Sequence, residues 1–166
     1  LMSKRFSLRE FQQNILSRIE AQEKSATAQA STLGVQVGQG LWLIDMQEIS
    51  EVLPLPSVTP VPLTQPWYRG VANVRGNLYS ISDFSSFLGL GETRGEGLAR
   101  VLLVSPKLDC NVGLLVTSVL GLYDTSKWRS EVHDSGEQLF NEQGQVWRKL
   151  DLAQLVHQPD FLHVGV

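Results

Sequence analysis

The stretch that decides the fold begins at Trp67, ends at Phe84 and reads W-Y-R-G-V-A-N-V-R-G-N-L-Y-S-I-S-D-F. Two short β-prone runs, GVANV and NLYSI, lie on either side of a turn glycine, Gly76, which is typical of strands in an antiparallel sheet. Asp83 follows the second run and is placed to cap a short apolar helix. The pattern therefore predicts strand, turn, strand and helix.

The side chains of this stretch can be assigned to faces by alternation along a strand. Val71 and Asn73 share one face, and Arg75 falls at the strand end beside the turn. An arginine there can reach across a cleft to a carboxylate or a carbonyl. Two roles follow for Arg75, and both stay open: an internal salt bridge that locks the turn, or a contact with a partner.

Similar runs fill most of the remaining chain, and no long helix separates them. Close spacing of this kind predicts a mainly β protein with antiparallel sheets or small barrels. Five of the seven prolines lie between Pro54 and Pro66, which predicts an edge or rim segment, because proline cannot donate a ladder hydrogen bond. The other runs are LGVQV (33–37), GLWLIDM (40–46), RVLLV (100–104), NVGLLV (111–116) and GQVWRKL (144–150).

The chain contains a weak internal duplication. The run from Gly76 to Asp83 is repeated 68 positions later from Gly144 to Asp151, and an apolar stretch follows each aspartate. Upstream, Ile44, Met46, Ile49 and Val52 match Leu114, Val116, Val119 and Leu122 at an offset of 70. We therefore expect two blocks, residues 33–90 and 98–160, that depend on each other through a shared interface. Exchange of a strand between them stays open.

Residues 1–32 are predicted to form a helix and a linker. Ser7 and Glu10 make a capping box, and the segment from Lys24 to Thr32 lacks a large apolar residue. The helix would pack on its own domain, dock on a partner or lie on a membrane surface, and the first is favoured. Its apolar stripe consists of Leu8, Phe11, Ile15 and Ile19.

Composition excludes several classes of protein. Of 166 residues, 42% are hydrophobic and 19% are charged, which is ordinary for a globular chain. Residues 33–166 hold 9 basic and 14 acidic side chains, which argues against a nucleic-acid surface. No apolar run approaches the ~20 residues of a membrane-spanning helix, and the start is too polar for a secretory signal. We expect a cytoplasmic, soluble protein.

Sequence motifs for catalysis are weak. The single cysteine, Cys110, has no motif that orients a base toward it, and His133, His157 and His163 have no metal-ligand spacing. Glu48 and Glu51 are three apart and read as a solvated face. We expect no enzyme, no cofactor and no metal site, with a hydrolase using Cys110 as a remote alternative.

The W-Y-R-G-V-A-N-V-R-G-N-L-Y-S-I-S-D-F stretch resembles the central signature of CheW-like domains. Glu51 resembles the family's acidic residue after its second strand, and residues 112–119 resemble its G-L-V-V-D-x-V strand, with Thr117 in place of the usual Asp. The resemblance covers roughly residues 33–156. The signature residues in this chain are Gly70, Val71, Asn73, Arg75, Gly76 and Asp83.

The resemblance implies two SH3-like five-stranded β-barrel subdomains side by side and a non-catalytic adaptor. Such an adaptor couples a methyl-accepting chemoreceptor to a CheA-type histidine kinase. The first barrel's outer face would bind the kinase's regulatory domain, and the groove between the barrels would take the receptor's cytoplasmic tip. The implied receptor-binding residues are Arg75, Glu51, Gly70, Val71, Asn73 and Gly76.

Within the family, the N-terminal extension and the wording of residues 67–76 are most similar to adaptors of type IV pilus (twitching motility) systems. The protein would then be a monomer alone and part of a larger array, held at the inner membrane through its partners without inserting into it. The alternative is an SH3- or OB-like module that binds peptide or nucleic acid. Such a module needs a basic or aromatic groove, and only Trp67 and Tyr68 offer one.

Overall fold

The computed structural model describes residues 32–166, so the predicted N-terminal helix lies outside the described residues. The protein is mainly β, as predicted, and its strands form two sheets. None of the helices in the described part is long and apolar enough to cross a membrane. The strands are β1 (Thr32–Val37), β2 (Gly40–Asp45), β3 (Ile49–Pro54), β4 (Tyr68–Val74), β5 (Asn77–Asp83), β6 (Arg100–Val104), β7 (Val112–Val116), β8 (Ser118–Tyr123), β9 (Arg129–His133), β10 (Gly136–Phe140) and β11 (Val146–Leu150). The helices are η1 (Met46–Glu48), α2 (Phe84–Phe87), η2 (Pro106–Leu108), α3 (Leu152–Leu155) and α4 (Pro159–Leu162).

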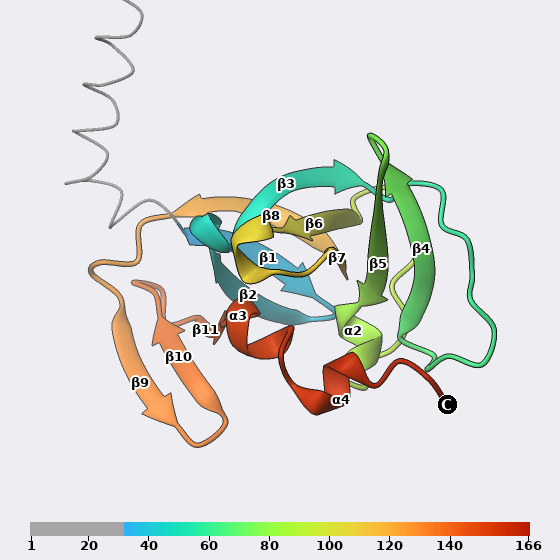
Figure 1. The fold of residues 1–166 in the computed structure, drawn as a ribbon. Coiled ribbons are helices and arrows are strands. Elements are labelled where there is room, and N and C mark those ends of the chain that lie inside the picture. The colour runs from blue at the N-terminus through green and yellow to red at the C-terminus, as the bar shows by residue number, and fades with distance from the viewer. Residues whose placement is uncertain (1–31) are drawn as a thin grey trace, which may run out of the picture.

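The two sheets differ in size. The six-stranded sheet has the order β8-β1-β2-β11-β10-β9, and the five-stranded sheet has the order β3-β6-β7-β5-β4 (Figure 1). Neighbouring strands are antiparallel except for the pairs β2–β11 and β5–β7, which are parallel. The family resemblance implied two units of five strands each. One sheet has five strands, and the other has a sixth strand, β9.

The strand pairing follows the internal duplication. Ser80 on β5 pairs with Val112 on β7, and Arg148 on β11 pairs with Trp42 on β2. Arg148 lies 68 positions after Ser80, and Val112 lies 70 positions after Trp42, which are the offsets found in the sequence. Each copy therefore gives its first two strands to the sheet that holds the other copy's last strands. The glycine-rich segment between the blocks, residues 89–97 (GLGETRGEG), was expected to mark the subdomain boundary. It does not separate the sheets, because each sheet takes strands from both sides of it.

The sixth strand has a proline-rich counterpart in the other copy. β9 pairs with β10, whereas the residues that precede β4 make a single bridge, from Thr59 to Val71. Thr59 and Val71 exchange two backbone hydrogen bonds of 2.8 and 2.9 Å. The five prolines of this stretch lack the N–H groups that would extend the ladder. The predicted rim segment is confirmed, and it explains why the five-stranded sheet has one strand fewer than the other sheet.

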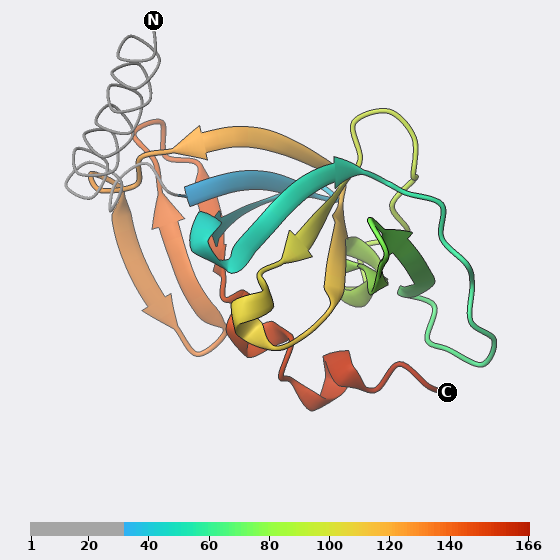
Figure 2. The same cartoon turned by 45° about the horizontal axis from the view of Figure 1, so that its top comes forward.

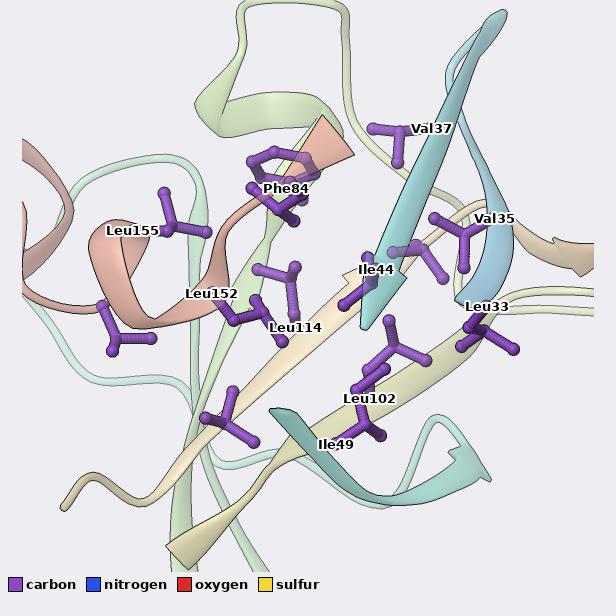
Figure 3. Packing of buried hydrophobic residues seen from close by; sticks show 14 of the residues in the cluster. Leu33, Val35, Val37, Ile44, Ile49, Phe84, Leu102, Leu114, Leu152 and Leu155 are labelled. Atoms are coloured by element: carbon purple, nitrogen blue, oxygen red, sulfur yellow. The ribbon is translucent and has the colours of Figure 1, made fainter. Parts of the chain in front are cut away.

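The two sheets share the largest hydrophobic cluster, and each sheet also has a smaller cluster of its own. Ile44 of the six-stranded sheet and Leu114 of the five-stranded sheet are fully buried in the same cluster as Phe84 of α2 and Leu152 of α3 (Figure 3). Because strands of each copy complete the other's sheet, neither block can bury its apolar surface alone. We expect the protein to unfold in one transition.

Aspartates begin both of the helices that follow the repeated strand, as predicted. The carboxylate of Asp151 accepts a hydrogen bond from the backbone N–H of Gln154 at 3.1 Å and is exposed. The carboxylate of Asp83 is buried and accepts from the backbone N–H of Ser86 at 3.4 Å. It also accepts from the N–H of Thr93 at 2.6 Å and from its hydroxyl at 2.7 Å. Asp83 therefore caps α2 and anchors the glycine-rich segment.

The two caps should differ in strength. We expect Asp83→Ala to destabilise the protein by about 2–3 kcal/mol. The change removes a helix cap and leaves two buried donors of Thr93 without an acceptor. Asp151→Ala should cost about 0.5–2 kcal/mol, the ordinary cost of a lost cap. Differential scanning calorimetry should show one transition for both variants. Equal losses would contradict the anchoring role of Asp83, and two separate melting steps would contradict the shared core.

Glu48 connects the two copies and is half-buried, unlike the solvated face expected for it. Its carboxylate accepts from the backbone N–H of Ala153 in α3 at 2.9 Å, and its carbonyl accepts from the N–H of Ser105 at 2.8 Å. Burial raises the pKa of Glu48 above the ordinary 4.5, and the nearby carboxylate of Asp151 adds to the effect, although the bond from Ala153 opposes it. The folded protein therefore holds this proton more tightly than the unfolded chain does.

The raised pKa of Glu48 sets the direction of a pH effect. The stabilising contribution of Glu48 is complete below its unfolded pKa and is lost as the pH rises through its folded pKa. Glu48→Gln keeps an oxygen that accepts from Ala153 and removes this loss, so its stability relative to wild type should increase between pH 4 and pH 7. Glu48→Ala should cost about 1 kcal/mol at pH 4, where the wild-type side chain stabilises most, and less at pH 7. Urea unfolding at the two pH values checks both results, and a Glu48→Gln protein whose stability relative to wild type falls from pH 4 to pH 7 would contradict them.

Candidate partner-binding site

Arg75 and Gly76 form the two-residue turn between β4 and β5. Val74 pairs with Asn77, and the two turn residues have φ values of 54° and 87°. Positive φ at both positions matches the right-handed twist of a hairpin. The side-chain oxygen of Asn73 accepts a hydrogen bond from the N–H of Gly76 at 2.9 Å and fixes the turn. The predicted place of Arg75 at the strand end is confirmed.

The side chain of Arg75 reaches Glu51 on β3. Nη1 donates to Oε2 at 2.9 Å and Nη2 donates to Oε1 at 2.5 Å, so the pair is bidentate. β3 and β4 are the two outer strands of the five-stranded sheet. The ion pair therefore joins opposite ends of one sheet and presents a positive and a negative group side by side.

This ion pair is accessible to a partner. The side chain of Arg75 is 75% exposed and that of Glu51 is 31% exposed. Ion pairs at such exposure contribute about 0–1 kcal/mol to stability, because water screens them. A guanidinium has five N–H donors, so the pair with Glu51 does not exhaust them. The salt bridge expected for Arg75 is present, and it leaves the group available for binding.

Gly70 and Val71 serve the fold at the other end of β4. Gly70 is buried with φ at 132°, and a Cβ there would lie 2.1 Å from the carbonyl oxygen of Thr59. Val71 is half-buried and makes the backbone bonds to Thr59. Four strand residues separate Gly70 from Arg75, and the five residue steps span about 16 Å. The structure thus brings together Glu51, Asn73, Arg75 and Gly76, and it holds Gly70 and Val71 apart from them.

Exposed apolar residues also lie on two edge strands, and the sequence analysis did not single them out for binding. Val52 on β3 is 37% exposed and Leu122 on β8 is 60% exposed. Val52 and Leu122 occupy equivalent positions in the two copies. The apolar pattern of the sequence grouped them with core residues such as Ile49, which is buried. β3 and β8 are edge strands that cross the same side of the molecule in both views (Figures 1 and 2). The unpaired backbone groups of such edge strands are available for pairing with another chain.

The threonine that replaces the family's aspartate has a structural partner. The hydroxyl of Thr117 accepts a hydrogen bond from the N–H of Gly38 at 2.9 Å, and its N–H donates to the carbonyl of Gln36 at 2.9 Å. These bonds tie the β7–β8 connection to the β1–β2 turn. A carboxylate oxygen at this position would meet the same N–H donor.

The remaining candidates for chemistry are scattered. Burial raises the pKa of the half-buried Cys110 thiol, and the carboxylate of Asp109 adds to the rise, so the thiolate is scarce at neutral pH. Nδ1 of His157 lies 2.6 Å from the carbonyl oxygen of Ala153. Across residues 32–166, no three His, Cys, Asp or Glu side chains gather in a way that would hold a metal ion.

The arrangement defines a class of protein: a β scaffold whose accessible features, an ion pair and two apolar strand edges, are suited to binding other proteins. Residues 31–160 match the family model of the CheW-like domain, and the chain belongs to this family. The family resemblance drawn from the W-Y-R-G-V-A-N-V-R-G signature is thereby confirmed.

Two relatives support this assignment. The chain is 37% identical over 100 residues to "Protein PilI" of Pseudomonas aeruginosa, in a match that covers 60% of this chain and 56% of PilI. It is 27% identical over 97 residues to "Chemotaxis protein CheW" of Thermotoga maritima, a match that covers 58% of this chain and 63% of that protein. The matched part thus spans less than two thirds of either relative.

A solved structure has the same fold. The scaffolding protein TtCheW of Thermoanaerobacter tengcongensis superposes with a TM-score of 0.68 at 18% sequence identity. The superposition covers 80% of this chain and 95% of that one. The two-sheet architecture is therefore that of a CheW scaffold.

Proposed function

We propose that this protein is a non-catalytic adaptor that couples a methyl-accepting chemoreceptor to a CheA-type histidine kinase. The greater identity to PilI than to CheW, together with the resemblance of residues 67–76 to type IV pilus adaptors, supports a role in twitching-motility signalling. The adaptor works in the cytoplasm and reaches the inner-membrane receptor array through its partners.

The observation that carries this proposal is the exposed Arg75–Glu51 pair at the β4–β5 turn. Its bidentate geometry holds the guanidinium in one orientation, so little side-chain freedom remains to be lost on binding. Val52 follows Glu51 on β3 and is exposed, but alternation along the strand turns it to the opposite face. A receptor tip with a carboxylate would match the remaining N–H donors of Arg75.

The kinase is assigned to the outer face of the five-stranded sheet, which holds most of the first block's strands. Separate surfaces are required because an adaptor must hold both partners together. The receptor surface consists of Glu51, Asn73, Arg75 and Gly76, with Gly70 and Val71 supporting the strand that carries the turn.

Titration calorimetry with the purified full chain tests the proposal. The probes are a receptor fragment that contains the cytoplasmic hairpin tip and the kinase's CheW-like regulatory domain. We expect each to bind alone and each to bind with unchanged affinity when the other is already bound. Competition between them would contradict separate surfaces. Salt-dependent binding of an oligonucleotide, with neither protein bound, would favour the nucleic-acid alternative.

A further inference from the structure

A groove lies between the two capping helices. No residue of the proposed receptor surface lines it, so the receptor is assigned to the β4–β5 turn and not to this groove between the copies. Its volume is about 810 Å³. Phe84 and Phe87 of α2 line it from one copy, and Leu155 of α3 lines it from the other, with Trp42 and Leu108 between them. Figure 3 shows Phe84 and Leu155 on adjacent helices. The groove therefore lies at the seam between the copies, and apolar and polar side chains both line it.

The charged residues around the groove are mainly acidic. Two lysines, Lys107 and Lys149, face four carboxylates there. The carboxylates are Asp45, Glu48, Glu137 and Asp151. A segment that fits the groove should combine an apolar stripe with a basic polar face.

The chain holds such a segment where it enters the described structure. Thr32, the first described residue, pairs with Asp45 across the β1–β2 ladder, and Asp45 lines the groove. Residues 1–31 carry five basic and three acidic side chains, the reverse of the balance in the groove. The twelve residues 20–31 can span up to about 40 Å when extended, so the preceding segment can reach any part of it.

We propose that residues 6–19 dock in this groove as an amphipathic helix. The apolar stripe Leu8, Phe11, Ile15 and Ile19 has the spacing by which helices bind apolar grooves. In that position the stripe covers the exposed parts of Phe87 and Leu108, and Arg9 and Arg18 on the polar face lie near the carboxylates. The helix covers the seam between the two copies, and its contacts span both sheets.

Paramagnetic broadening of backbone amide signals in the full-length protein tests this docking. A nitroxide is attached at Gln158→Cys in a Cys110→Ala background; Gln158 lines the groove, and its side chain makes no cap hydrogen bond. The label should broaden the amides of residues 8–19. The same label at Leu78→Cys, which is exposed and about 20 Å along β5 from Phe84, should leave them sharp.

Two further results of the labelling experiment show whether residues 6–19 of the same chain or a second copy of the protein occupy the groove. No broadening of residues 8–19 from Gln158→Cys would overturn the proposal. Broadening that appears in unlabelled protein mixed with labelled protein would also overturn it, because a second copy would then occupy the groove.

Melting temperature gives a second readout in unlabelled full-length protein. Ile15→Asp, on the apolar stripe, should lower it by about 2–4 °C, whereas Gln12→Asp, which adds the same charge to the polar face, should not. Equal effects of the two substitutions would contradict burial of the stripe.

Discussion

Gly70→Ala is expected to destabilise the protein by about 4 kcal/mol or more. The new methyl group would lie 2.1 Å from the carbonyl oxygen of Thr59, which is backbone and cannot rotate away. The φ of 132° at Gly70 adds a strain of about 1–3 kcal/mol for any other residue. Relief requires the proline-rich segment to separate from β4, with loss of both Thr59–Val71 hydrogen bonds. Chemical denaturation measures the loss.

Gly76→Ala is the matched control. Gly76 also has a positive φ, at 87°, but a Cβ there would meet nothing within 4 Å. The cost should stay near 1 kcal/mol, the cost of the backbone conformation alone. If Gly70→Ala were as stable as Gly76→Ala and lost only receptor binding, Gly70 would be a contact residue and its structural role would be wrong.

Arg75→Ala is expected to weaken receptor binding by about 2 kcal/mol or more, roughly thirtyfold. Its stability should change by less than about 1 kcal/mol, because the lost ion pair is exposed. Arg75→Lys should recover little of the affinity, since an ammonium cannot reproduce the rigid fork of donors. Kinase binding should survive both substitutions. An Arg75→Ala protein that melts early and loses both partners equally would show that Arg75 only braces the turn.

A charge swap separates the two roles of the pair more sharply. The double variant Glu51→Arg with Arg75→Glu keeps opposite charges on β3 and at the turn, so the ion pair and the stability should persist. A carboxylate would then stand at the turn in place of the guanidinium that the receptor binds. The affinity of the variant for the receptor should fall at least as far as that of Arg75→Ala. Retained receptor affinity in this variant would contradict recognition of Arg75.

The repeated blocks show how far the sequence predicts this fold. Periodicity predicted the strands around Gly76 and Gly144, and the capping rule predicted Asp83 and Asp151. The offsets of 68 and 70 appear again in the strand registers. The exchange of strands stayed open, because alternation identifies the buried face of a strand and does not say which sheet the strand joins.

The site was less accessible from the sequence. Arg75 stood out because a turn glycine follows it, but its partner Glu51 was known only through the family resemblance. Val52 and Leu122 fit the apolar pattern of buried neighbours, and they are exposed because β3 and β8 have no strand beyond them. The buried bonds from Thr93 to Asp83 join residues ten apart across a glycine-rich loop, where no periodic signal exists.

Receptor-dependent activity of the kinase tests the adaptor role most directly. Receptor in membrane vesicles, the histidine kinase and ATP are combined with the full chain, and phosphate transfer to the kinase's own histidine is measured. Kinase activity should respond to the receptor only when the protein is present, and Arg75→Ala should abolish that response while Gln12→Asp retains it. A receptor response of equal size without the protein would contradict the coupling function.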